Sequence, residues 1–452
     1  MDMPQTPPVS DQAARRRMEH QRLRWRLLYG QAEQDIEARI RQAIGNIRRE
    51  MWGPIDMSSN PFLDAWNAAS ALYKEAPTII PPSAAEQVVM AQVDSVGWWS
   101  RMQRVQRDTL ALRECPVFID WQPNQPLVIR QVPPYMVEVK VYPRRPTQPR
   151  QVTEWARDPD APTRWVRHVY DQPSASYRVY DERDLDVTER VAGGTFEGDS
   201  YPWQGARGPI LPWVTYHAQD TGWYWDAYAA REVVEGTLQL GVLYSYYSHL
   251  MRAASWAQRY VIGAEPVGAE VDAEGGTREV VTDPASLLQL QVSDGSTNTT
   301  VGQWQPSADP ERVLASVHSY ERRVLDKAVG SLSVSRASSD IRSGFSLAVS
   351  REDQRALQRS YTPSFRRTDL ELLGKIADMQ GLERRGWRIE YKSIPQDPTE
   401  SQAQLDRISK LVDLGLIDRV TAYMELHPAV THDEAVAAVA MIAATNNQGQ
   451  TP

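Results

Sequence analysis

A polar segment at residues 331–344 carries the side chains whose types point most directly to a chemical role. It contains five serines and two arginines, namely Ser331, Ser333, Ser335, Ser338, Ser339, Arg336 and Arg342. Guanidinium groups and short hydroxyls contact phosphate oxygens without reading nucleotide sequence. The same composition fits a flexible polar loop at the surface, which is the favoured interpretation while only the local residues are considered.

Patterns for catalysis and metal binding give no convincing match in the sequence. Gly374-Lys375 is followed by Ile376 instead of serine or threonine, so the phosphate loop of nucleotide-binding proteins is absent. The seven histidines contain no His-x-x-x-His pair, and Cys115 is the only cysteine that could add a ligand. Gly344-Phe345-Ser346 lacks the second glycine of a hydrolase nucleophile elbow. We therefore expect no enzyme activity, no cofactor and no metal.

One enzyme class stays open because the chain has fifteen tryptophans beside many carboxylates. Carbohydrate-cleaving enzymes place paired carboxylates on either side of a bound sugar ring. Here the tryptophans are spread over the whole chain, which favours anchoring in cores and interfaces. A carbohydrate-active enzyme is therefore an alternative, and carboxylates clustered in a cleft would support it.

The overall charge limits how the chain can contact nucleic acid. Across 452 residues the formal net charge is -8, with 41% hydrophobic and 24% charged residues, as in an ordinary globular protein. Binding along a broad basic surface needs an excess of lysine and arginine to neutralise phosphates. Any contact with DNA should therefore be local or weak.

Compartment and membrane association can also be predicted. The single cysteine, Cys115, excludes an internal disulfide framework and fits a reducing cytoplasm. The N-terminal residues look unlike a signal peptide. The uncharged stretch Gly236–Met251 is shorter than the ~20 residues that a membrane span needs. We expect a chain that is made and assembled inside a cell, without a membrane.

The N-terminal region is predicted to be helical after a short polar tail. Residues 1–12 and 445–452 are expected to be disordered tails. From Asp11 to about Met51 the pattern is helical, with ten arginines against five acidic residues between Ala13 and Glu50. A solvated helix face is the expected explanation of this charge run.

Residues 13–225 are predicted to form a mixed α+β module. Helices are expected at Asn60–Lys74 and Ser83–Arg113, the second led by a Pro-Pro-Ser start signal. Alternating apolar residues predict strands at Trp165–Tyr170 and Tyr177–Asp181. Gly208–Val214 closes the module.

A pair of helices separated by a β insertion follows. The first, at 226–258, carries small residues that let a neighbouring backbone approach, namely Gly236, Gly241, Ser245 and Ser248. The insertion at 259–307 contains predicted strands at Tyr260–Ile262 and Leu287–Val292 and a hairpin around Glu274–Thr277. The second helix, at 308–330, is capped by Asp309. Its apolar stripe should pack on the first helix, and consists of Val313, Val317, Tyr320 and Val324.

The last third of the chain is predicted to be mainly helical. A long helix from Gly344 to Gln380 should be kinked by Pro363, and a strand is expected at Arg384–Ile394. Residues 398–444 form a small helical module, with one helix capped at Asp418 and another by a capping box at Thr431–Glu434.

This order of elements resembles the portal proteins of tailed bacteriophages over nearly the whole chain. Local phrases that carry the resemblance are Asn60–Tyr73, Gly208–Val214, Ser343–Leu347 and Leu414–Thr421. The departures lie mainly in the Pro-rich region between Pro116 and Pro162.

The resemblance implies an α+β, mainly helical fold of named parts: a wing at 13–225 and 345–397, stem helices at 226–258 and 308–330, a β clip at 259–307, a tunnel loop at 331–344 and a helical crown at 398–444. It places Ser335, Arg336, Ser338, Ser339 and Arg342 beside DNA in a channel. The same resemblance implies that the clip meets the packaging motor and head-tail adaptor through Glu270, Asp272, Glu274, Arg278 and Glu279. With this resemblance, DNA contact becomes the favoured interpretation of the Ser/Arg loop.

The resemblance also implies partners and a location. The subunit would form a homo-oligomeric ring, typically of twelve copies, through which double-stranded DNA passes without sequence-specific contacts. Partners would be the terminase large subunit, the head-tail adaptor, and the major capsid and scaffolding proteins. The ring would be assembled in the host cytoplasm and lie at the portal vertex of the virion.

Two further expectations concern contacts between copies. Trp98-Trp99 and Trp223-Tyr224-Trp225 are predicted either to anchor neighbouring subunits as exposed clusters or to be core. In a second alternative, a helical capsid assembly or scaffolding protein, the Arg-rich N-terminal helices would be the main interface. Truncation of residues 1–50 should then abolish assembly.

Overall fold

A computed structural model of the chain describes residues 7–44, 54–123, 125–255, 258–262, 264–266, 290–292, 300–304, 309–329, 344–392, 398–426, 435–440 and 442. The chain divides into two compact units. The first, which we call the body, is built from Met1–Tyr29, Phe62–Arg231 and Leu325–Pro452. The second, the helical unit, is built from Gly30–Pro61 and Glu232–Val324. The chain therefore crosses between the units four times, after residues 29, 61, 231 and 324.

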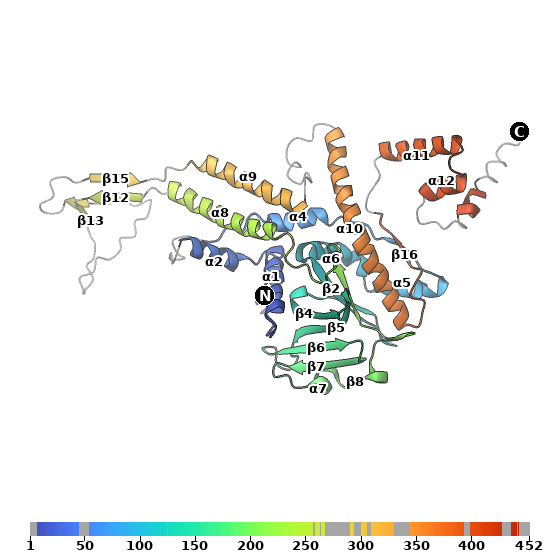
Figure 1. The fold of residues 1–452 in the computed structure, drawn as a ribbon. Coiled ribbons are helices and arrows are strands. Elements are labelled where there is room, and N and C mark those ends of the chain that lie inside the picture. Colours follow the sequence, from blue (N-terminus) through green and yellow to red (C-terminus); the bar gives the residue numbers. More distant parts are fainter. Residues whose placement is uncertain are drawn as a thin grey trace. The chain divides into compact units, whose positions relative to one another are not determined.

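A five-stranded antiparallel sheet forms one layer of the body (Figure 1). Its strands, in spatial order, are β4 (Val137–Tyr142), β5 (Arg145–Arg157), β6 (Trp165–Asp171), β7 (Ser176–Asp181) and β8 (Phe196–Glu197). The spatial order equals the chain order, as expected when each strand pairs with the next through a turn. Trp155 and Trp165 of this sheet are buried together with Tyr135 and with Met18 from the N-terminal helix.

A second sheet has β2 (Glu114–Asp120) at its centre, between β11 (Trp213–His217) and β3 (Val128–Gln131). Six of the seven residues of β2 are buried, which fits a central strand covered on both faces. Three further short elements complete the described strands of the body: the pair β1 (Thr78–Ile80) and β16 (Arg388–Glu390), the pair β9 (Gln204–Gly205) and β10 (Gly208–Pro209), and an isolated bridge from Tyr180 to Asp186.

The body also contains helices from all three of its chain segments. They are α1 (Gln12–Leu28), α4 (Pro61–Ala69), η1 (Ala84–Glu86), α5 (Gln87–Ser95), α6 (Trp98–Leu112), η2 (Pro134–Met136), α7 (Thr188–Ala192), η3 (Gly198–Ser200), α10 (Gly344–Met379), α11 (Pro398–Asp413) and α12 (Arg419–Leu426). The second sheet is contacted by α6 at β2 and by α10 at β11. Helices and sheets are thus combined in the body, and the predicted α+β class is confirmed.

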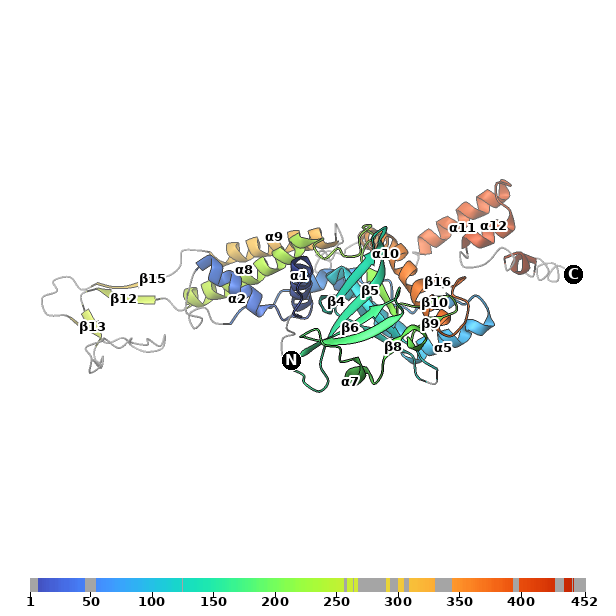
Figure 2. The ribbon, with the colours of Figure 1, turned by 60° about the horizontal axis from the view of Figure 1, so that its bottom comes forward.

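The helical unit contains α2 (Glu33–Ile44), α8 (Arg231–Ser255) and the main part of α9 (Pro310–Val329). Figure 2 gives a second view of α8 and α9, which lie side by side in both views. Between them the chain forms β12 (Gln258–Ile262), β13 (Ala264–Pro266), β14 (Leu290–Val292) and β15 (Thr300–Trp304). β12 pairs with β15 and β13 pairs with β14, both antiparallel.

Several local predictions are confirmed. β6 and β7 match the two alternating segments, and β12 matches the strand predicted at Tyr260–Ile262. The carboxylate of Asp309 accepts a hydrogen bond from the Glu311 backbone N–H at 3.0 Å, as an N-cap does. Asp418 caps α12 in the same way through the Thr421 N–H at 3.0 Å.

Glycines with left-handed backbone angles divide two of the predicted helical regions, so the single helix predicted at Ser83–Arg113 is wrong. The region from Asp11 to Met51 contains α1 and α2, separated at Gly30, where φ is +66°. Ser83–Arg113 is divided into η1, α5 and α6, with Gly97 at φ +63°. Residues with a Cβ adopt this conformation only at a cost, so glycine marks both breaks. The helix predicted at Asn60–Lys74 ends earlier, at Ala69.

β5 was not predicted, because Pro146 and Pro149 interrupt its apolar pattern. The structure explains how they are tolerated. Pairing with β6 begins only at Gln151, and the register with β4 shifts twice around Val141. Both prolines therefore lie where β5 has a partner on one side only, so their missing N–H groups cost little.

The expectation of a solvated Arg-rich face is wrong for the inner side of α1. Arg17 is 7% exposed, while Gln21 and Arg24 are fully buried. The predicted polar tail is also wrong at Val9, which is buried among Met18, Tyr135 and the sheet tryptophans. α1 is therefore part of the core of the body.

The residues of the two aromatic clusters differ in burial. Trp98 and Trp99 are buried, so they are core residues of the body. Tyr224 is also buried, whereas Trp223 is 70% exposed. The predicted hairpin around Glu274–Thr277 and the capping box at Thr431–Glu434 lie outside the described residues.

Candidate functional site

The helix pair α8–α9 is held together by close backbone approach at a glycine. A Cβ built on Gly236 would lie 2.6 Å from Cγ2 of Val324, closer than any real contact allows. Val317 and Val324 are buried, and Val313 and Tyr320 are half-buried. The predicted apolar stripe of the second helix therefore packs on the first, and Gly236 provides the space for it.

Polar contacts fix the register of the same pair. The Glu321 carboxylate of α9 accepts hydrogen bonds from Tyr244 of α8, at 2.9 Å, and from Ser59. Ser248 donates to Asp56 at 2.8 Å, and the Asp56 backbone N–H donates to Ser245 at 3.0 Å. The hydroxyls of α8 thus bind the segment before α4 as well as α9.

The exposed side of α9 carries a stripe that the sequence analysis missed. Arg312, Ser316, Ser319, Arg323 and Lys327 are spaced by four, three, four and four residues, and all five are exposed. At 3.6 residues per turn this spacing puts them on one flank of the helix, which we call the α9 stripe. The stripe holds three cations and two hydroxyls, and one exposed carboxylate, Asp326, borders it.

The α9 stripe has few contacts that compete for its charge. Arg312 lies 3.4 Å from the capping carboxylate of Asp309, in an exposed ion pair of little strength. The Arg323 guanidinium lies over the ring of Tyr320 at 5.2 Å. Charged groups of this kind stay available to a ligand in solution. The apolar stripe was found from its periodicity, and the same count applied to the polar residues would have found the α9 stripe.

The predicted Ser/Arg loop begins directly after this helix. α9 ends at Val329 and α10 begins at Gly344. The loop residues singled out above lie outside the described residues, namely Ser335, Arg336, Ser338, Ser339 and Arg342. In sequence, the helix that carries the α9 stripe is therefore followed directly by the Ser/Arg loop. Arginine and serine occur in both.

The β insertion is closed at its base by β12 and β15. Gln258 pairs with Trp304 and Ile262 with Thr300, so the chain enters and leaves the insertion through one antiparallel ribbon. β12 begins three residues after α8 ends, and α9 begins six residues after β15 ends. The predicted binding residues Glu270, Asp272, Glu274, Arg278 and Glu279 lie outside the described residues.

A buried charge cluster joins α1 to the sheets of the body. Arg17 donates to the carbonyls of Val137, at 2.7 Å, and Pro134, at 3.2 Å, and to Oε1 of Gln21 at 2.6 Å. Gln21 in turn donates to Glu114 at 2.9 Å. Burial lowers the pKa of Arg17 to about 10 and raises the pKa of Glu114 to about 7. Partners more than ninety residues away in sequence make this cluster invisible to pattern analysis.

A second arginine of α1 fastens the segment that precedes α8. Arg24 donates to the carbonyl of Ala111 at 2.9 Å and to that of Ala229. Arg113 donates to Asp226 at 2.9 Å in a largely buried ion pair. Two residues beyond Ala229 the chain enters α8, so these bonds hold the last turn of the body before the crossing.

A buried carboxylate on α10 joins three tyrosines. Asp369 accepts hydrogen bonds from the hydroxyls of Tyr73 and Tyr216, each at 2.7 Å, and Tyr391 at 2.6 Å. It is fully buried, and that burial raises its pKa to about 6 despite the three donors. Burial of a negative charge without a neighbouring cation costs free energy, so burial favours the protonated form of Asp369. This cluster ties α10 to β11 and to the segments after α4 and β16.

Neither a metal centre nor a membrane span is found in the described part of the chain. No group of three or more potential ligand side chains gathers there. The described helices include none that is long and apolar enough to cross a bilayer.

Comparison with known proteins gave one kind of match. No family model and no curated protein matches the sequence. Among solved structures, the chain is similar to a chain of the "Virion of native gene transfer agent (GTA) particle", with 12% identity and a TM-score of 0.41. The alignment covers 81% of this chain and 89% of that chain. A TM-score below 0.5 does not establish a shared fold.

Proposed function

We propose that the chain is a subunit of the portal ring of a tailed bacteriophage or related particle. In this role it forms the channel for packaging and ejection of double-stranded DNA. It also provides the docking site for the terminase motor and, later, for the head-tail adaptor. The single observation that carries the proposal is the α8–α9 pair, which supports a β ribbon at one end and presents the α9 stripe along its second helix.

The positive charge of the α9 stripe suits contact with DNA, a polyanion that must move through the proposed channel. A ring of copies repeats the stripe around a central axis, so DNA meets cations and hydroxyls at every subunit. Arginine and serine contact phosphates without sequence preference, which a moving duplex requires. Because the whole chain has a net charge of -8, these contacts are local and do not add up to tight binding.

The β ribbon suits docking of a partner protein. β12 and β15 hold the two ends of a long insertion together. In the proposed ring, these insertions form the clip that contacts the terminase large subunit and the adaptor. Residues 13–225 and 345–397 form the wing, which contacts neighbouring copies and the capsid and scaffolding proteins. The ring, of twelve copies as the resemblance implies, resides at the portal vertex of the virion.

Electron microscopy of the purified full-length chain tests the ring directly. We expect closed rings with a central hole, seen end-on. A chain that stays monomeric at high concentration, with and without scaffolding protein, would overturn the proposal.

The DNA contact needs a separate test in a packaging assay. Arg312→Gln combined with Arg323→Gln should lower DNA packaging or retention several-fold while rings form as in the wild type. Arg336→Ala with Arg342→Ala should act in the same way if the Ser/Arg loop also contacts DNA. The control is Arg322→Gln, which removes an arginine that is also exposed from the other flank of α9. Equal loss of packaging in the control and in the stripe variant would show that position on the helix does not matter.

A further inference from the structure

A groove on α10 has an unusual combination of an apolar floor and a basic rim. It has a volume of about 520 Å³ and is lined by Arg359, Thr362, Pro363, Arg366, Arg367 and Leu370. The six residues are spaced by three, one, three, one and three positions, so they lie along one side of the helix. The three arginines and Pro363 are exposed, and Leu370 is half-buried. We call this feature the α10 groove.

The chemistry of the α10 groove defines what it can bind. Its rim carries three guanidinium groups, and Arg367 forms an ion pair with Asp220 at 2.6 Å that is exposed and therefore easily replaced. Pro363 and Leu370 between them offer apolar surface that phosphate or a DNA backbone would not use. The best complement is a protein segment that presents an apolar side chain between carboxylates.

The body itself presents such a segment, at the turn between β7 and α7. Leu185 is 58% exposed, although it is a large apolar residue. Its neighbours Asp184 and Asp186 expose 76% and 39% of their side chains. Leu185 and Asp181 bond each other twice, because the Leu185 N–H donates to Asp181 Oδ1 at 2.9 Å and the Asp181 N–H donates to the Leu185 carbonyl at 3.0 Å. The apolar tip is therefore held outward by a fixed turn.

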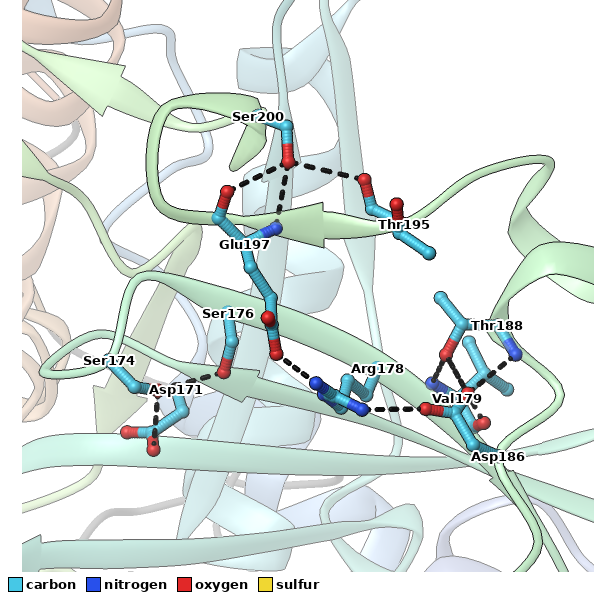
Figure 3. Close-up of polar contacts among 10 residues, drawn as sticks. All are labelled: Asp171, Ser174, Ser176, Arg178, Val179, Asp186, Thr188, Thr195, Glu197 and Ser200. Carbon is cyan, nitrogen blue, oxygen red and sulfur yellow. Dashed lines mark hydrogen bonds and ion pairs between the residues drawn. The ribbon is translucent and has the colours of Figure 1, made fainter.

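Figure 3 shows how the base of this turn is anchored. Asp186 accepts a hydrogen bond from the Thr188 backbone N–H at 2.9 Å and forms an ion pair with Arg178 at 2.8 Å. Arg178 also pairs with Glu197, which belongs to the capping box of η3 with Ser200. A turn that is already fixed loses little conformational entropy on binding, which favours its use as a contact.

We propose that the Asp184–Leu185–Asp186 turn of one copy seats in the α10 groove of the next copy. Leu185 covers Pro363 and Leu370, and the carboxylates face the arginines of the rim. The proposal rests on the proposed ring, because two different patches that complement each other generate a ring when the rotation between successive copies closes. Asp184 already pairs with Arg167 at 2.6 Å, but its carboxylate has lone pairs left to accept a second guanidinium.

Charge reversal at the two patches provides the first test. Leu185→Lys and, separately, Arg366→Glu should each lower the fraction of chains in rings at least ten-fold, measured by sedimentation and electron microscopy. Asp184→Arg combined with Arg366→Glu in one chain should restore rings, because the introduced arginine then faces the introduced glutamate. Val88→Lys and Arg385→Glu are matched controls: each changes a similarly exposed residue of the body outside both patches and should leave rings intact. Circular dichroism and thermal melting confirm that every variant is folded.

Disulfide trapping provides the second test. A chain with Leu185→Cys and Thr362→Cys should form a ladder of covalent oligomers on oxidation, since the native Cys115 is buried. Two outcomes would overturn the proposed contact without contradicting the ring. Either the double-cysteine chain forms rings without cross-links, or the Leu185→Lys chain assembles normally. Arg366→Glu chains that form rings but lose DNA overturn it in favour of a polyanion site. If no rings form, the proposed function fails, and cross-linked dimers at high concentration still decide whether the two patches meet.

Discussion

Two Arg-rich helices, α1 in the body and α9 mainly in the helical unit, use the same side chain in opposite ways. In α1, Arg17 and Arg24 are buried and donate to backbone carbonyls of distant segments. In α9, Arg312 and Arg323 are exposed and make only weak contacts. A guanidinium with five donors satisfies several carbonyls at once when it is buried, and keeps its charge for a ligand when it is not. Arginine content alone therefore does not identify a nucleic-acid surface.

The largest effect is expected when a buried arginine of α1 is removed. Arg24→Ala removes two hydrogen bonds to carbonyls and leaves a cavity in the body. We expect it to lower the free energy of unfolding by about 4 kcal/mol, the sum of a cavity and unsatisfied carbonyl groups. Urea denaturation measures the change. Arg16→Ala, at an exposed position of the same helix, is the control and should shift stability by less than about 0.5 kcal/mol. Similar losses in both variants would contradict the difference between the two faces of α1.

A second effect, of about 3 kcal/mol, should appear as a pH dependence in the body. The pKa of Asp369 rises from its ordinary 3.8 to about 6 in the folded state, because the carboxyl is buried. The folded state therefore binds the proton more tightly, so the stability from this group is full below about pH 4 and is lost as the pH rises through 6. A rise of this size in the pKa of one carboxyl corresponds to about 3 kcal/mol of unfolding free energy.

Asp369→Asn should remove this part of the pH dependence, because the amide does not titrate, while the part that comes from Glu114, with its pKa raised to about 7, should remain. Urea midpoints measured from pH 3.5 to 7 compare the slopes of the two proteins. Tyr391→Phe serves as a control that keeps the titrating carboxyl but deletes a donor that lowers its pKa, so its slope should become steeper and not disappear. An unchanged slope in Asp369→Asn would mean that another group titrates.

The smallest effect is expected in the helical unit, where the contact between α8 and α9 depends on the shape of the packed residues and not on their charge. Gly236→Val places side-chain atoms where Val324 already lies, and overpacking of this kind costs about 2 kcal/mol. Adding Val324→Ala should recover at least half of the loss, because it empties the space that the new side chain needs. Thermal melting of the two variants measures this. Failure of the second change to rescue the first would show that the helices do not meet at this position.

Local structure could be predicted from the sequence wherever the signal is short-range. Asp309 followed by Pro310 marked the start of α9, and the apolar spacing from Val313 to Val324 identified its packed side. The alternating strands β6 and β7 were also correct. In each case the residues that determine the structure are neighbours along the chain or lie on one face of one element.

The errors have long-range causes. The burial of Arg17 depends on carbonyls 117 and 120 residues away, and no pattern within α1 distinguishes a buried arginine from a solvated one. The acceptor role of Asp369 depends on tyrosines from three other segments. Of the candidate site, the apolar packing of the helix pair was predicted and the α9 stripe was overlooked, while the loop and clip residues lie outside the described residues.

The burial of α1 also limits what the truncation of residues 1–50 can distinguish. Truncation of residues 1–50 would separate a scaffolding protein, which loses assembly, from a ring subunit only if α1 were dispensable for folding. α1 supplies Met18, Arg17 and Arg24 to the core of the body. The truncation would therefore unfold the chain whether it is a scaffolding protein or a ring subunit. Point changes on the exposed side of α1, such as Arg16→Glu, test the scaffolding alternative without this defect.

The four crossings between the units have a consequence for the order of events during synthesis. Residues 30–61 contact α8 through Ile36 beside Gly241 and through Asp56 beside Ser245, yet about 170 residues of the body are translated between them. At roughly 5–20 residues per second, the ribosome needs on the order of ten to thirty seconds to supply the missing partner. The first segment of the helical unit must wait through that interval with its apolar side uncovered. A cellular chaperone that binds this uncovered side would act in that interval, before α8 leaves the ribosome.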